Sequence, residues 1–166
     1  MSPFLKALFF VLLFSLTGCT TQGTPDSLVV LGEAEHVLLE PEHVLLAARI
    51  DTGADTSAIS ATNIEPFKKD GRQWVRFTID DMSTQKPVVL ERIVLKRIRI
   101  RRTQGEDEIR MVVGLTMQIG KLKLTREFGL TDRSRFTHEV LIGRNFLDGQ
   151  ALVDVSKRYT VGVPRQ

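Results

Sequence analysis

Three consecutive residues, Asp51, Thr52 and Gly53, have the types and the position that catalysis by carboxylates requires. They directly follow the run 44–50, whose apolar residues predict a buried strand. A carboxylate at the end of a buried strand is costly unless it is solvated in a turn or paired. Two carboxylates within hydrogen-bonding distance do not both ionise easily, so one serves as an acid and the other as a base. Asp51 is therefore either a turn residue or half of a catalytic pair.

A second segment near the C-terminus favours the catalytic interpretation. The apolar residues 140–142 are followed by Gly143, Arg144 and Asn145. A strand ending in Asp-Thr-Gly and a later strand ending in Gly-Arg-Asn resemble, in this order, two segments of the retropepsin-like aspartic peptidases. Residues from about Val29 to Gly162 are most similar to a bacterial group often labelled "ATP-dependent zinc protease". The matching segments are 50–54, 56–58, 74–78, 130–133 and 141–144.

The resemblance implies an all-β fold, a small closed barrel or sandwich of the retropepsin type with one short C-terminal helix. It implies Asp51, Thr52 and Gly53 as the catalytic residues. Since the sequence contains a single Asp-Thr-Gly, the second carboxylate must come from another copy of the chain. The resemblance therefore implies a homodimer in which the two copies of Asp51 meet on the symmetry axis and Thr52 bonds across the interface.

The same resemblance implies supporting roles around this loop. Gly53 and Ala54 would offer backbone groups to a peptide substrate. Asp55 would form an ion pair with Arg144, with Asn145 beside it, and this charged contact would hold the catalytic loop on the helix. Some relatives of the bacterial group lie beside ligases that add glutamate to proteins, which hints at an acidic or glutamyl-modified substrate.

A hairpin with arms 98–102 and 109–113 is the predicted cover of the site, and its tip contains Gln104 and Gly105. We expect Ala54, Asp55, Gln104 and Gly105 to bind substrate. Several basic residues on the arms favour an acidic substrate, or they are simply the solvated outer face of the hairpin, with Ile98 and Ile100 facing inward. A third possibility is contact with anionic lipid.

Cofactors are not expected, despite the label of the bacterial group. The three histidines, His36, His43 and His138, form no His-Glu-x-x-His pair, and no phosphate-binding Gly-x-x-x-x-Gly-Lys-Ser/Thr loop is present. We expect His36 and His43 on the polar face of a hairpin and His138 in a loop. No metal and no ATP are predicted.

Short, β-branched or alternating runs separated by turn residues predict a β-rich domain. The sequence Glu-His-Val-Leu-Leu occurs at Glu35 and again at Glu42, which predicts two strands of one hairpin. The predicted strands are 29–31, 37–39, 44–50, 74–79, 93–100, 109–113, 117–119, 122–124 and 140–142.

The N-terminus resembles a bacterial lipoprotein signal. An apolar run at 7–16 follows Lys6 and ends in Leu16-Thr17-Gly18-Cys19, which is similar to the lipobox, and Cys19 is the only cysteine. We therefore predict a signal peptide at 1–18, lipidation of Cys19, a polar tether at 19–27 and a peptidase domain at 28–166. By resemblance to known lipoprotein sorting patterns, Thr20 rather than Asp after the cysteine implies the outer membrane, facing the periplasm, in an organism that has two membranes.

Composition limits the remaining choices. With 166 residues, 42% hydrophobic and 26% charged, the chain has room for one globular domain. A formal net charge of +3 is too small to indicate nucleic-acid binding. Three interpretations stay open: an active envelope endopeptidase, a protein that binds peptides without cutting them, and a structural or adaptor lipoprotein with the same fold.

Overall fold

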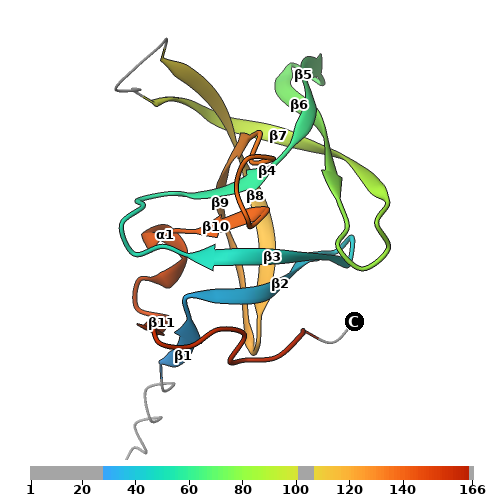
Figure 1. The fold of residues 1–166 in the computed structure, drawn as a ribbon. Helices are drawn as coiled ribbons and strands as arrows, with labels where there is room; N and C mark the ends of the chain where they lie inside the picture. Colours follow the sequence, from blue (N-terminus) through green and yellow to red (C-terminus); the bar gives the residue numbers. More distant parts are fainter. Residues whose placement is uncertain (1–27, 101–106, 165–166) are drawn as a thin grey trace, which may run out of the picture.

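The computed structural model describes residues 28–100 and 107–164, and in this part of the chain a closed β-barrel dominates (Figure 1). Its strands follow the order β2-β3-β10-β4-β9-β8, and the antiparallel pairing of β2 with β8 closes the ring. The bounds are β2 (Ala34–Glu40), β3 (Val44–Ile50), β10 (Val140–Ile142), β4 (Ser57–Ser60), β9 (Leu122–Thr131) and β8 (Glu108–Ile119). The predicted all-β barrel is confirmed.

Three smaller parts are attached to the barrel: a three-stranded extension, a short helix and a two-stranded sheet. The long strand β7 (Pro87–Ile100) pairs with β8 and extends beyond the barrel. It also pairs with β6 (Arg72–Asp80), which pairs with β5 (Thr62–Lys69), and we call these three strands the wing. One short helix, α1 (Arg144–Leu147), follows β10. A separate two-stranded parallel sheet pairs β1 (Val29–Gly32) with β11 (Ala151–Asp154). No helix of residues 28–100 and 107–164 has the length and the apolar character needed to cross a bilayer.

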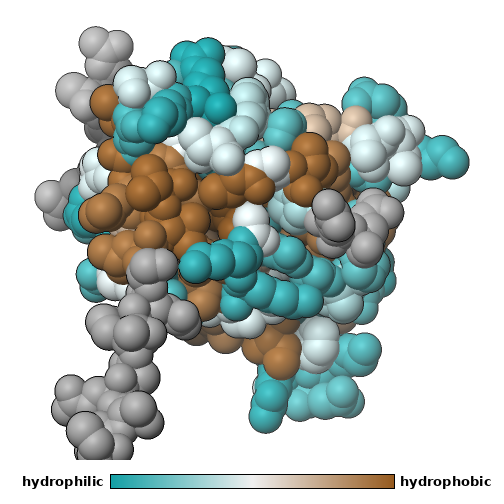
Figure 2. All heavy atoms as spheres, turned by 90° about the horizontal axis from the view of Figure 1, so that it is seen from below, coloured by the Kyte–Doolittle hydropathy of each residue, from teal (hydrophilic) through white to brown (hydrophobic). Residues whose placement is uncertain are grey.

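The β1–β11 sheet has one buried and one exposed side. Side chains alternate along a strand, so Leu28, Val30 and Leu152 share the exposed side, with Val30 and Leu152 directly opposite each other. We call these three side chains the apolar face. Figure 2 shows brown side chains gathered on the side of the molecule seen from below, where β1 and β11 lie in Figure 1.

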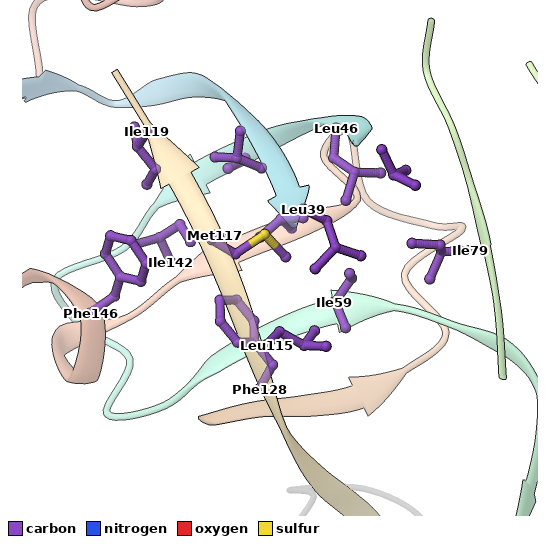
Figure 3. Close-up of a cluster of buried hydrophobic side chains, with 14 of the residues drawn as sticks. Leu39, Leu46, Ile59, Ile79, Leu115, Met117, Ile119, Phe128, Ile142 and Phe146 are labelled. Atoms are coloured by element: carbon purple, nitrogen blue, oxygen red, sulfur yellow. The ribbon is translucent and has the colours of Figure 1, made fainter. Parts of the chain in front are cut away.

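The core fills the inside of the barrel. In β8 the buried residues Val113, Leu115, Met117 and Ile119 alternate with half-buried ones, as expected for a strand with one face on a core. Figure 3 shows Met117 among side chains from the other strands, together with Phe146, which extends from α1. The helix is thus fixed to the barrel by its own apolar side chain, which sets the position of Arg144 and Asn145 beside it.

The strand order places the Asp-Thr-Gly and Gly-Arg-Asn segments at one end of the barrel. β10 lies between β3 and β4, parallel to β3 and antiparallel to β4. Because β3 and β10 run in the same direction, their C-terminal ends lie side by side. Asp51 follows one of these ends and Gly143 follows the other, so two segments that are far apart in the sequence come together here.

Most predicted strands are present, with corrections. The Glu-His-Val-Leu-Leu repeat forms the antiparallel pair β2–β3, as predicted, but His43 lies in the connecting turn with a positive φ of 56°. The two strands predicted at 109–113 and 117–119 are one strand, β8. Strands β4, β5 and β11 were not predicted. The signal peptide, Cys19 and the tether lie outside the described residues.

Candidate active site

Asp51 is the first residue after β3, and its backbone is fixed from two sides. Its N–H donates to Ile142 O at 2.9 Å, which joins it to β10. Its own carboxylate oxygen Oδ1 accepts the N–H of Gly53 at 2.9 Å, and Ala54 N donates to Asp51 O at 3.3 Å. The loop therefore folds back under a half-buried carboxylate, while Thr52 and Gly53 are exposed.

Arg144 fastens this loop to the start of α1. Its guanidinium pairs with the Asp55 carboxylate, and its Nη1 donates to Thr52 O at 2.8 Å. Its backbone N–H donates to Ala54 O at 2.8 Å, and the next amide, Asn145 N, donates to Asp55 O at 3.1 Å. Four contacts thus connect residues 52–55 with residues 144–145, and they fix the loop that carries Asp51.

A second set of contacts lies beneath the loop. Asn145 Oδ1 accepts both Ser57 N, at 2.9 Å, and Ser57 Oγ, at 2.8 Å, and Asn145 Nδ2 donates to Glu127 O at 2.8 Å. Ser57 Oγ in turn accepts Gly143 N at 3.0 Å. At Gly143 an added Cβ would lie 2.9 Å from Ala54 O, so only glycine permits this close approach of the turn to the loop.

The carboxylate of Asp51 borders a strongly basic pocket of about 500 Å³. Four arginines and one histidine line this pocket with it, and we call it the basic pocket. Its lining is Arg49, Asp51, Arg133, Arg135, Phe136, Thr137, His138, Leu141 and Arg158. A pocket of this composition favours an anionic group next to the candidate catalytic carboxylate.

Two groups of the basic pocket are affected by burial and by charge. Burial lowers the pKa of His138; Glu139 opposes this effect, and the positive charges of the nearby arginines add to it. Burial also lowers the pKa of Arg133, and Arg110 lowers it further, whereas the carboxylates of Asp51 and Glu139 favour the cation. His138 is therefore biased toward the neutral form, and Arg133, whose ordinary pKa is very high, remains a cation.

Other predicted site residues have mixed outcomes. The N–H of Ala54 donates to Asp51 O within the loop, and its C=O accepts Arg144 N from the start of α1, so both backbone groups already have partners. Gln104 and Gly105 lie outside the described residues. The arms of the predicted cover do pair, with Ile98 opposite Arg110, and Ile98 and Ile100 are half-buried while Arg97 and Arg99 are exposed. This alternation supports the solvated-face interpretation for the exposed arginines.

Sequence reasoning missed Arg133 and Ser57. The segment 130–133 matches the bacterial group, but nothing in a charged loop signals that one of its arginines is buried. Among residues 28–100 and 107–164, no group of three or more His, Cys, Asp or Glu side chains is arranged to hold a metal ion.

A closed barrel that holds an Asp-Thr-Gly loop against a Gly-Arg-Asn turn is the arrangement of retropepsin-like proteins. Comparison with protein families agrees: residues 30–164 match the family described as RimB-like, retropepsin-like aspartic endopeptidase RimB. The chain therefore belongs to the RimB-like family of retropepsin-like aspartic endopeptidases.

Individual relatives have a different name. Proteins of Shewanella pealeana and Shewanella halifaxensis, each named "Probable alpha-L-glutamate ligase", are 35% identical over 119 residues. A protein of the same name from Parasynechococcus marenigrum is 33% identical over 123 residues. These matches cover 70% to 73% of this chain but 26% of each relative, so the chain spans about a quarter of the length of the curated relatives it matches.

A solved structure is also similar. The crystal structure of Lpg0085, a Legionella pneumophila protein of unknown function, has a TM-score of 0.70 and 27% identity to this chain. The similarity covers 81% of this chain and 98% of the Legionella chain.

Proposed function

We propose that this protein is a membrane-tethered aspartic endopeptidase that hydrolyses acidic peptides, using a dyad formed by Asp51 of two copies. The observation that carries the proposal is the position of Asp51: a braced loop presents its carboxylate at the edge of a basic pocket. In the dyad, the protonated carboxyl polarises the scissile carbonyl and the ionised one takes a proton from the attacking water.

The single Asp-Thr-Gly supports a homodimer, and one surface of the chain would suit such a contact. A groove of about 770 Å³ connects the catalytic loop with the apolar face, since both Thr52 and Leu152 line it. The lining also includes Leu28, Arg144 and Leu147. Burying exposed apolar side chains stabilises association. A second copy docked on the apolar face would lie next to Thr52 and close to Asp51.

The preference for acidic peptides rests on the charge of the basic pocket. It also agrees with the names of the relatives, which are described as ligases of glutamate and share this domain with the chain. A ligase that adds glutamate produces acidic peptide segments, and a peptidase with a basic pocket is suited to cutting such segments.

The proposal is tested with the purified mature domain and an unbiased peptide library that includes acidic peptides. We expect products from the parent protein and none from Asp51→Asn, which keeps the shape of the side chain but removes the base. Asp70→Asn is the control, because Asp70 is an exposed turn residue of the wing at a positive φ that asparagine also adopts. Turnover by Asp51→Asn would rule out the dyad. Peptide binding by both forms without product would identify a peptide-binding protein instead.

The membrane tether is a separate part of the proposal and has its own test. A thioether to lipid on Cys19 would hold the domain at the membrane, since each buried methylene of an acyl chain contributes about 0.8 kcal/mol. We expect Cys19→Ser to move the protein from the membrane fraction to the soluble fraction. An unchanged distribution between the fractions would contradict lipidation.

A further inference from the structure

Arg133 is an unusual cation because it is buried beside the candidate catalytic carboxylate. Only 6% of the residue is exposed, and it lies in the loop between β9 and β10. Across the described part of the chain, no carboxylate lies within 4.0 Å of its guanidinium, although Asp51 and Glu139 are near enough to favour its charge. Burying a guanidinium without a close carboxylate partner costs free energy, so the buried position of Arg133 calls for a reason.

The side chain of Arg133 is held in place by contacts that leave its charge available. Its Nε donates to His138 O at 3.2 Å, its guanidinium stacks over the Phe136 ring at 4.5 Å, and its backbone N–H donates to Ser60 Oγ at 3.2 Å. These contacts involve Nε, the π-face and the backbone. The two terminal amino groups of the planar fork, which match the two oxygens of a carboxylate, remain for a ligand.

The surroundings of Arg133 determine on which side an anion can bind. The residue lines the basic pocket together with Asp51, and it also lines a neighbouring pocket of about 540 Å³. Four carboxylates line that second pocket: Asp80, Asp81, Asp132 and Glu139. They would repel an anion, so a carboxylate ligand of Arg133 belongs in the basic pocket.

We propose that Arg133 is the residue that determines specificity in this enzyme, by binding the side-chain carboxylate of the substrate residue next to the scissile bond. The inference rests on the proposed function and assigns its acidic preference to one residue. An acidic side chain placed beside an ionised dyad meets a like charge. The buried guanidinium offsets this repulsion, and it is already desolvated and held before the substrate arrives.

The other arginines of the basic pocket are less suited to this role. Arg158 pairs with Glu33, and Arg49 and Arg135 are exposed. Exposed cations are hydrated and flexible, and they contribute little to a single contact. They raise the general positive potential of the pocket, whereas Arg133 offers a fixed geometry.

The test measures binding and therefore needs no turnover. In the Asp51→Asn background, fluorescence anisotropy gives the dissociation constants of two labelled peptides, one with consecutive glutamates and one with glutamines in their place. We expect the glutamate peptide to bind about tenfold more tightly or better, as for a hydrogen bond to a charged group. Arg133→Gln should remove most of this preference. Arg135→Gln also removes one positive charge, at the rim of the pocket, and should keep most of the preference for the glutamate peptide.

Three results would overturn the inference: no preference in the Asp51→Asn protein, an unchanged preference in folded Arg133→Gln, or an equal loss in Arg135→Gln, which would indicate a general field. Thermal melting shows whether Arg133→Gln folds. If Arg133→Gln does not fold, Arg133→Lys tests the inference instead. Lysine keeps the charge but lacks the planar guanidinium, so this variant should retain only part of the preference for the glutamate peptide. Absence of cleavage by the parent protein would contradict the proposed function but not this binding preference.

Discussion

Asn145 connects β4, β9 and α1 with a single side chain, just beyond the loop that carries Asp51. Its amide oxygen accepts two hydrogen bonds from Ser57, and its amide nitrogen donates to Glu127 O. Asn145→Ala leaves these partners without their bonds, so we expect a loss of about 1–3 kcal/mol in the free energy of unfolding. Urea denaturation measures this loss.

A double-mutant cycle with Ser57→Ala isolates the contact between the two side chains. Because Ser57 and Asn145 share hydrogen bonds, the losses caused by the two substitutions should not add. Fully additive losses would show that the pair does not act as a unit and would remove this support from the catalytic loop.

At the scale of elements, the turn between β10 and α1 depends on Gly143. An alanine there places Cβ 2.9 Å from Ala54 O, so the turn must move away from the loop. We expect Gly143→Ala to lower the free energy of unfolding by about 1–3 kcal/mol, as for other overpacked positions, and to reduce cleavage. Gly114→Ala is the matched control, because its Cβ would lie 3.7 Å from Leu95, an ordinary contact. Equal behaviour of the two variants would contradict the close approach.

The turn between β6 and β7 is organised by the buried carboxylate of Asp81. Burial tends to raise its pKa, but hydrogen bonds from Thr84, Ser83 and the N–H of Leu45 outweigh burial and hold the pKa below its ordinary value. The carboxylate therefore stabilises the fold above its unfolded-state pKa of about 3.9, and this contribution is lost as the pH falls through the lower folded-state pKa.

Asp81→Asn should accordingly be less stable than the parent at neutral pH, and the difference in the free energy of unfolding should shrink in acid. Denaturation at a series of pH values measures the difference. A gap that widens as the pH falls would mean that the pKa is shifted in the other direction.

The sequence indicated the barrel because its strands alternate or are uniformly apolar, but other elements gave no such signal. Nearly every side chain of β5 is exposed and Pro66 lies within it, so the strand has no buried face to detect. β11 has four residues and is recognisable only through its pairing with β1. Gly114 directly follows the predicted strand 109–113, but it continues β8 rather than ending a strand.

The candidate site was predictable where local chemistry defines it. The turn at Asp51 and the ion pair of Arg144 can be predicted from the types of residue in two short segments of the sequence. The burial of Arg133 depends instead on Phe136, His138 and the far strands, and such tertiary surroundings cannot be read from a single charged loop.

At the scale of the whole molecule, the apolar face is the predicted contact between two copies. Leu152 is 56% exposed and lies opposite Val30. We expect Leu152→Asp to place a charge in the contact, to shift the protein to monomers in sedimentation equilibrium and to lower cleavage about tenfold or more, as for a central interface residue. Val89→Asp, on the wing and 61% exposed, is the control and should remain dimeric. Dimers of Leu152→Asp would place the interface elsewhere.

The central claim, that two copies of Asp51 form one catalytic centre, is tested most directly by mixing subunits. Parent chains and Asp51→Asn chains are refolded together in equal amounts, so that they assort at random, and the peptidase activity per parent chain supplied is compared with parent chains refolded alone. A shared dyad leaves active only the dimers of two parent chains, about a quarter of all dimers, so the mixture should show about half of the activity per parent chain. Unchanged activity per parent chain would show that each copy acts alone and would contradict the account.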